Sequence, residues 1–179
     1  MKFLDQVKIF VKAGDGGSGS ASMRREKFIE YGGPDGGNGG KGASIILKAE
    51  RNLNTLIDYR YTQHFKAERG ENGKGKNKTG KTGKDLILKV PIGTQILEED
   101  NNTLIEDFTK SEQKKIIAKG GRGGLGNVRF KSSTNRSPRK KTDGSKGEDF
   151  WIWLQLKFIA DIGIVGMPNS GKSSLLSVL

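Results

Sequence analysis

The sequence contains no cysteine, which excludes disulfide bonds, thiolate metal sites and cysteine nucleophiles. A single histidine, His64, cannot build a zinc site by itself, and we expect a structural role for it. No run approaches the roughly eighteen apolar residues of a membrane helix. The amino terminus also lacks the uninterrupted apolar stretch of a signal peptide. These absences favour a cytoplasmic protein without a membrane span.

Acidic residues are in the minority. The chain has 20 Asp and Glu against 32 Lys and Arg, a formal net charge of +12 and a pI near 9.9. Such an excess indicates a polyanionic partner, either nucleic acid or an anionic membrane face. The length of 179 residues leaves room for one ordinary domain and the beginning of a second.

Short apolar runs, bounded by glycine, proline, asparagine or charge, predict a mostly β first domain. They occupy residues 3–11, 44–48, 85–90, 103–108 and 115–118, and residues 52–59 suit a turn or two of helix. The most apolar stretch, residues 150–159, carries both tryptophans, and we interpret it as a buried or edge strand rather than a base-stacking surface. A domain boundary is expected near Ala160, which gives domains at 1–159 and 160–179.

Glycine is abundant and regularly spaced. The chain holds 27 glycines, with triplet spacing at 33, 36, 39 and 42, at 120, 123 and 126, and in the pairs 14/17, 70/73 and 80/83. Because a polyproline-II helix turns once every three residues, this spacing predicts packed polyproline-II helices with glycine on the contact stripe. The alternative is a flexible linker. Collagen is excluded, since the pattern breaks after a few triplets and there are only four prolines.

Residues 166–173, GMPNSGKS, fit the phosphate-loop pattern G-x-x-x-x-G-K-[ST]. A short apolar strand, Asp161–Val165, precedes it and a plausible helix starts at Ser173, which is the strand–loop–helix order of such loops. The alternative is a glycine turn with a fortuitous lysine. The candidate nucleotide-binding residues are Gly166, Met167, Pro168, Asn169, Ser170, Gly171, Lys172 and Ser173, with Lys172 on the phosphates and Ser173 on Mg²⁺.

Only six residues follow Ser173, too few to supply the remaining parts of a nucleotide site. We therefore expect this 179-residue piece alone neither to bind nucleotide tightly nor to hydrolyse it, and we assign no catalytic residue within it.

Positive charge is clustered in three basic loops, at residues 24–27, 70–84 and 129–146. They contain few aromatic residues, which disfavours base stacking and favours folded RNA read through its shape and phosphates. No DNA partner is expected. The alternative is a solvated surface that only aids solubility. The candidate RNA-binding residues are Arg24, Arg25, Lys27, Lys74, Lys76, Lys78, Lys81, Lys84, Arg129, Lys131, Arg136, Arg139, Lys140 and Lys141.

Several ordered blocks resemble the Obg GTPases, which assist assembly of the large ribosomal subunit. The resemblance rests on RREKF at 24–28, GGPDGGNGG at 32–40, NLNTL at 52–56, VPIGT at 90–94, GGRGGLGN at 120–127 and ADIGIVGMPN at 160–169. It implies an Obg fold, in which polyproline-II helices stand on a small β-barrel, followed by the truncated start of a Ras-like α/β GTPase domain. It also implies GTP or GDP at 166–173, Mg²⁺ on Ser173, K⁺ on Asn169 and a monomer that contacts large-subunit rRNA.

The leading hypothesis is thus a GTP-binding protein of large-subunit assembly that hydrolyses GTP to GDP and phosphate when full length. Guanine specificity comes from the resemblance alone. The alternative is a stand-alone RNA-binding or ribosomal structural module with a non-functional phosphate loop. A membrane-surface protein is disfavoured because the sequence has no amphipathic basic helix.

Overall fold

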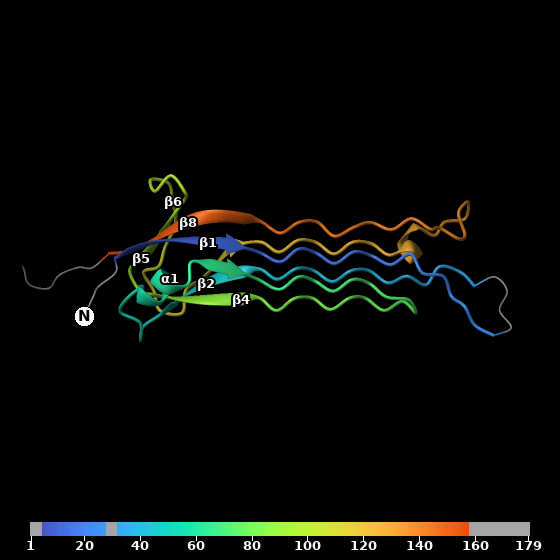
Figure 1. The fold of residues 1–179 in the computed structure, drawn as a ribbon, viewed down its shortest axis with the longest axis horizontal. Helices are drawn as coiled ribbons and strands as arrows, with labels where there is room; N and C mark the ends of the chain where they lie inside the picture. Colours follow the sequence, from blue (N-terminus) through green and yellow to red (C-terminus); the bar gives the residue numbers. More distant parts are fainter. Residues whose placement is uncertain (1–4, 28–31, 158–179) are drawn as a thin grey trace, which may run out of the picture.

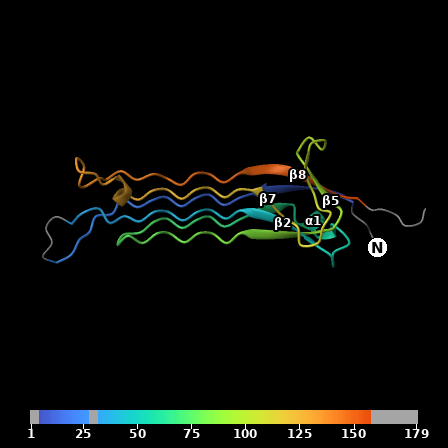
Figure 2. The ribbon, with the colours of Figure 1, turned by 180° about the vertical axis from the view of Figure 1, so that it is seen from behind.

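The computed structural model describes residues 5–27 and 32–157, which form an elongated molecule with two parts (Figure 1). Two β-sheets make up one end, and long parallel segments run from them to the opposite end. Figure 2 shows the same arrangement from behind. The expected boundary at Ala160, the expected domain at 160–179 and the phosphate loop at 166–173 lie outside the described residues.

The two sheets contain eight strands within the described ranges. The five-stranded sheet has the order β3 (His64–Lys66), β1 (Gln6–Lys12), β8 (Asp149–Leu156), β5 (Thr94–Leu97), β6 (Leu104–Asp107). The three-stranded sheet has the order β4 (Leu86–Pro91), β2 (Ile45–Glu50), β7 (Lys114–Ala118). A short helix α1 (Ile57–Tyr61) and a 3-10 helix η1 (Asn127–Phe130) complete the elements. We call the sheets and α1, residues 5–12, 45–66, 86–118 and 149–157, the two-sheet base.

Each apolar run predicted before residue 158 corresponds to an observed element, namely β1, β2, β4, β6, β7, β8 or α1, whereas the expected strand Asp161–Val165 lies outside the described residues. The prediction of a mostly β domain is confirmed. Strand β8 is neither buried on both faces nor at an edge, because it pairs with β1 on one side and β5 on the other. Strands β3 and β5 were not predicted, since three or four residues of mixed polarity carry no clear alternation.

The core lies between the two sheets and follows the alternation of the strands. Ile9 and Val11 of β1 and Leu154 of β8 face inward from one sheet, while Leu47 and Val90 face inward from the other, and all five are fully buried. On the outer face of β1 and β8, Phe10, Trp151 and His64 make ring contacts at 5.3–5.6 Å. His64 therefore packs as part of an aromatic cluster.

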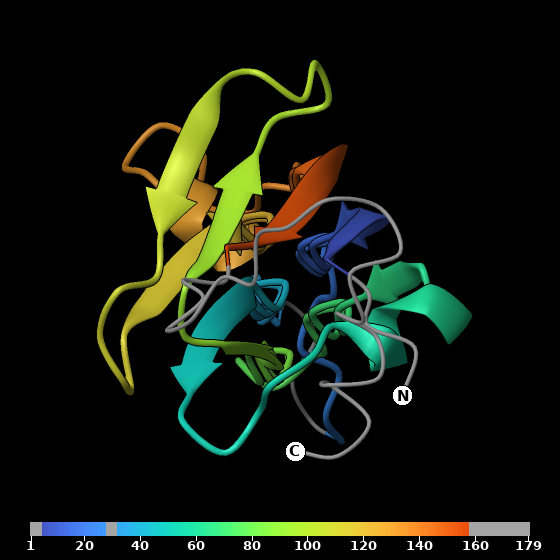
Figure 3. The ribbon, with the colours of Figure 1, turned by 90° about the vertical axis from the view of Figure 1, so that its left-hand side faces the viewer.

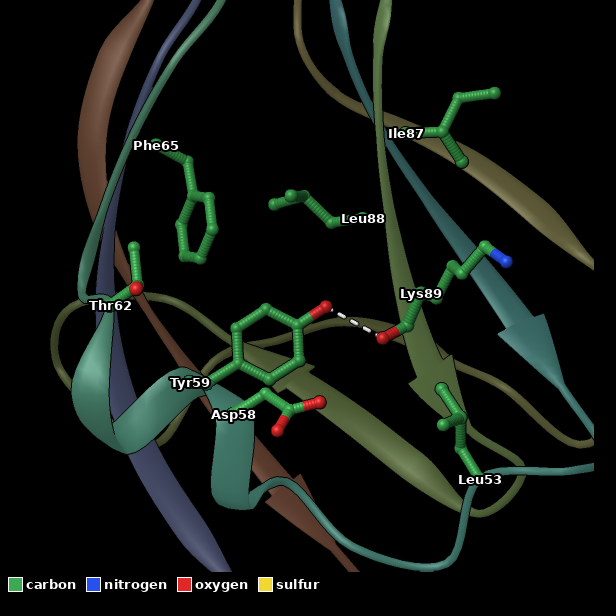
Figure 4. Close-up of a pocket in the computed structure, with 8 residues that line it drawn as sticks. All are labelled: Leu53, Asp58, Tyr59, Thr62, Phe65, Ile87, Leu88 and Lys89. Atoms are coloured by element: carbon green, nitrogen blue, oxygen red, sulfur yellow. Dashed lines mark hydrogen bonds between the residues drawn. The ribbon is translucent and has the colours of Figure 1, made fainter.

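The sheets do not close into the barrel that the resemblance implied (Figure 3). At the seam between β3 and β4, helix α1 occupies the edge of β4, where the Tyr59 hydroxyl donates to the Lys89 carbonyl at 2.6 Å. A hollow of about 320 Å³ remains there, lined by Leu53, Phe65, Ile87 and neighbouring residues (Figure 4). Burial raises the pKa of Tyr59, with a smaller contribution from Asp58, so the phenol remains a hydrogen-bond donor.

Six extended segments of the described chain, which we call rods, run side by side away from the base (Figure 1). They comprise residues 13–21, 37–44, 67–73, 79–85, 119–127 and 142–148. Gly126 has φ −75° and ψ 161°, close to polyproline II. At about 3.1 Å per residue, the eight residues of 37–44 span roughly 25 Å.

Hydrogen bonds join the rods with a period of three. In rod 37–44, the N–H groups of residues 37, 40 and 43 donate to carbonyls of rod 67–73 and the adjoining Lys74, at 2.8–2.9 Å. The N–H groups of residues 39 and 42 donate to rod 119–127, also at 2.8–2.9 Å. Each rod therefore bonds to different neighbours through successive faces, which confirms the interpretation of the triplet spacing and excludes a flexible linker at 32–42 and 120–126.

Glycine is required because the rods touch backbone to backbone. A Cβ atom built on Gly39 would lie against the Gly17 carbonyl, and one on Gly123 against the Gly39 carbonyl, both far inside the 3.0 Å that real Cβ atoms respect. Gly33, outside the rods, has nothing within 4 Å of such a Cβ. The contact stripe within the rods thus excludes any side chain, as the spacing predicts. Gly33, the first glycine of the predicted series at 33, 36, 39 and 42, does not belong to that stripe.

Candidate nucleic-acid interface

The rods end in four connecting segments, which we call the tip. They are residues 22–27, 32–36, 74–78 and 128–141, and they lie at the end of the molecule opposite the base (Figures 1 and 2). Segment 74–78 is a tight turn, in which the Lys78 N–H donates to the Gly75 carbonyl at 3.3 Å. The rods therefore hold these four segments together, although up to about a hundred residues separate them in the sequence.

Charge is distributed very unevenly along the molecule. The tip holds 12 basic and 2 acidic residues, the rods hold 7 and 6, and the two-sheet base holds 11 and 10. The rods and the base are thus nearly neutral, and the tip carries a charge of +10 out of the formal +12 of the chain. The fold gathers the excess charge of the sequence at one end.

The structure brings together twelve of the fourteen predicted RNA-binding residues. All fourteen are exposed. The twelve at the tip are Arg24, Arg25, Lys27, Lys74, Lys76, Lys78, Arg129, Lys131, Arg136, Arg139, Lys140 and Lys141. Lys81 and Lys84 lie instead on rod 79–85, so residues 70–84 form two rods joined by a turn and not one basic loop.

The two acidic side chains of the tip are already engaged. The Arg24 guanidinium donates to both carboxylate oxygens of Glu26 at 3.0 and 2.9 Å, and this hydrogen bonding lowers the pKa of Glu26. Among the described residues, Arg25, Lys76, Lys78, Arg129, Lys131, Arg136, Arg139, Lys140 and Lys141 form no ion pair. Most of the positive charge of the tip is therefore available to a partner.

Asp35 organises the tip. Its carboxylate accepts from the Ser22 hydroxyl at 2.6 Å and from the Lys76 N–H at 3.0 Å, and its carbonyl accepts from the Asn77 N–H at 2.7 Å. These bonds, that from Ser22 first, lower the pKa of Asp35. Lys76 and Asn77 have φ of 58° and 55°, a conformation that a lysine rarely adopts. Asp35 thus holds the turn in a strained shape that presents Lys76.

Asn127, which is fully buried, also bonds to backbone groups of other segments. Its Oδ1 accepts from the Gly36 N–H at 2.8 Å, and its Nδ2 donates to the Ser22 carbonyl at 2.8 Å. It therefore joins two tip segments to the end of rod 119–127. Asn127 and Asp35 were both missed in the sequence analysis, although each stands next to regularly spaced glycines. Glycine spacing does not show which polar side chain forms hydrogen bonds with the backbone of another segment.

Two structural observations bear on other function classes. Within residues 5–27 and 32–157 there is no group of three or more His, Asp or Glu side chains that could hold a metal ion. No helix in these same ranges is long and apolar enough to cross a bilayer. The predicted Mg²⁺ and K⁺ residues, Ser173 and Asn169, lie beyond the described part, as does the rest of the loop at 166–173.

The fold and the tip together define a class of protein, namely a glycine-rich β protein that carries a basic tip on a rigid bundle of polyproline-II rods. Comparison with known proteins gives the family. A sequence model of the GTP1/OBG family matches residues 4–158, and the chain belongs to that family. It is 72% identical over 177 residues to the GTPase Obg of Pelagibacter ubique (strain HTCC1062), covering 99% of this chain. The chain spans about half, 54%, of that relative's length.

Proposed function

We propose that this chain is the RNA-gripping part, with the first nucleotide-binding motif, of a cytoplasmic GTP-hydrolysing protein that acts in assembly of the large ribosomal subunit. The observation that carries the proposal is the charge distribution, because 12 basic and 2 acidic residues meet at the end of a rigid bundle. Membership of the GTP1/OBG family and a 72% identical relative called GTPase Obg support the GTPase part.

The shape of the molecule explains why RNA suits it. Rods that touch backbone to backbone at their glycines make a narrow shaft, so the tip can enter a channel lined by phosphate groups while the base remains outside. Lys and Arg side chains on a thin backbone neutralise phosphates without reading base edges. Aromatic residues are scarce at the tip, where Phe130 lies under the Lys140 ammonium at 5.7 Å, and this composition favours recognition by shape and charge.

The nucleotide site rests on sequence motif and family. Backbone amides of 166–173 would cradle the phosphates, Lys172 would neutralise charge on the β- and γ-phosphates, and Ser173 would ligate Mg²⁺. Asn169 would hold K⁺ where other systems use an arginine finger. Hydrolysis by in-line attack of water on the γ-phosphate is proposed for the longer protein only.

The test of the RNA proposal is the salt dependence of binding to purified large ribosomal subunits. The logarithm of the affinity should fall steeply with the logarithm of the salt concentration. Changing Lys78, Lys131 and Lys141 to glutamine should make that slope shallower by roughly 2–3, since each phosphate contact contributes about 0.7–0.9. The control changes Arg51, Lys66 and Lys114 to glutamine, which removes the same charge from the base. Equal slopes for the two triple variants would exclude the tip as the RNA-binding surface.

A further inference from the structure

A small polar hollow lies within the charged end of the molecule, beside the turn 74–78. It has a volume of about 250 Å³ and is lined by residues 36–38, by Asn77 and Thr79, and by Val128 and Arg129. Sites for drug-sized ligands usually measure about 300–1,000 Å³, so this one suits a group the size of a single nucleotide. The hollows of the base offer no comparable argument, since nothing in the structure shows what covers them.

The walls of the hollow are held rigidly from behind. Asn127 fixes the Gly36 N–H, Asn38 Oδ1 accepts from the Gly126 N–H at 2.9 Å, and Asp35 holds the backbone of Asn77. All three contacts are between the segments that form the hollow. Because the walls are set before any ligand arrives, binding costs little conformational entropy.

The side chains that line the hollow differ from those behind it. The side-chain amide of Asn77, the Thr79 hydroxyl and the Arg129 guanidinium make no hydrogen bond or ion pair within the described part of the chain. Asn127, Asp35 and Ser22, in contrast, are each bonded to another segment. The hollow therefore combines one guanidinium with two neutral polar groups that are free to bind a ligand.

We propose that this hollow binds one nucleotide of an RNA strand, with the phosphate on Arg129 and the ribose or base edge on Asn77 and Thr79. A guanidinium binds phosphate through two parallel N–H bonds, which positions the strand. An amide and a hydroxyl can bond to the 2′-hydroxyl, the group that distinguishes RNA from DNA. This inference rests on the proposed function and adds a defined contact to the diffuse charge of the tip.

The test uses the 179-residue chain, purified large ribosomal subunits, a double variant that leaves the charge unchanged and a single variant that removes one positive charge. Asn77→Gly combined with Thr79→Val removes both polar groups, and glycine accepts the left-handed conformation of residue 77. Two lost hydrogen bonds should weaken binding roughly tenfold or more, with no change of salt slope. Arg129→Gln should weaken binding and also lower the slope by about one phosphate contact.

The matched control is Ser133→Ala with Ser137→Ala, which removes two exposed polar groups of the tip outside the hollow. We expect this variant to bind like the wild type. If the Asn77/Thr79 variant also binds like the wild type, the hollow is not a binding site, while the proposed function stands. If the wild type itself fails to bind subunits, both proposals fall. Thermal melting checks the fold, and should the double variant melt early, Thr79→Val alone provides the comparison.

Discussion

The close contact at Gly39 allows a direct test of the rod packing. In Gly39→Ala, the new methyl group would meet the carbonyls of Gly17 and Ser18, which belong to the backbone and cannot rotate away. Rods 13–21 and 37–44 would then have to separate. Three N–H···O bonds join them at 2.8–3.0 Å, donated by Gly14, Gly17 and Ser20.

The loss of folding free energy caused by Gly39→Ala can be estimated from those hydrogen bonds. A buried backbone group left without a partner costs about 1–3 kcal/mol, so losing two or three bonds at about 1.5–2 kcal/mol each costs about 3–6 kcal/mol. For a chain of this size, about 2–4 °C of melting temperature corresponds to 1 kcal/mol, which gives a decrease of roughly 6–24 °C. This is a large part of the usual stability of about 5–15 kcal/mol.

The assay is thermal unfolding together with hydrogen exchange of peptides that cover residues 13–21 and 37–44. The matched control is Gly33→Ala, where a methyl group meets nothing within 4 Å. It should leave the melting temperature unchanged or slightly higher, since alanine restricts the unfolded chain. If the two variants melt within about 2 °C of each other and exchange equally, the requirement for glycine on the contact stripe is refuted.

Three further predictions concern the tip and the nucleotide loop. Because the pKa of Asp35 is lowered in the folded state, its contribution to stability is present above the ordinary value of 3.8 and is lost as the pH falls through the lower folded value. The chemical shifts of the backbone amides of Lys76 and Asn77 should therefore change together as the pH falls. In the variant Asp35→Asn these shifts should already be changed at pH 7. Shifts that stay constant down to pH 2 would contradict the proposal that Asp35 holds the turn. Titration of the 179-residue chain with a fluorescent GTP analogue should show no sub-micromolar binding, and tight binding would overturn that expectation. In a longer chain that continues past Leu179, GTP hydrolysis should be faster in K⁺ than in Na⁺, and equal rates would remove the role proposed for Asn169.

Much of the fold follows from local patterns. Alternation and short apolar runs predicted β1, β2, β4, β6, β7 and β8, because strand periodicity is a property of neighbouring residues. The triplet glycines predicted five of the six rods for the same reason, since the period of three repeats along each segment, whereas rod 142–148 was not predicted. The central position of β8 and the open seams depend on pairing between distant residues, so no local pattern contained them.

The tip was only partly predictable. The basic residues were evident from composition, but the sequence placed them in three separate segments and included Lys81 and Lys84, which lie on a rod. The hollow between residues 36–38, Asn77 and Arg129 joins segments about forty to ninety residues apart. Asn127 and Asp35 likewise act on backbone groups far away in the chain.

The amino-acid sequence by itself thus determined most of the strands, most of the glycine-rich rods and how much positive charge the molecule carries. The tertiary structure decided where the basic residues lie and which polar side chains form hydrogen bonds with other segments. The physical reason is that a rod of glycine triplets specifies its own period of three but not its neighbours. Only the packed bundle, through hydrogen bonds between remote segments, brings the basic turns together at one end.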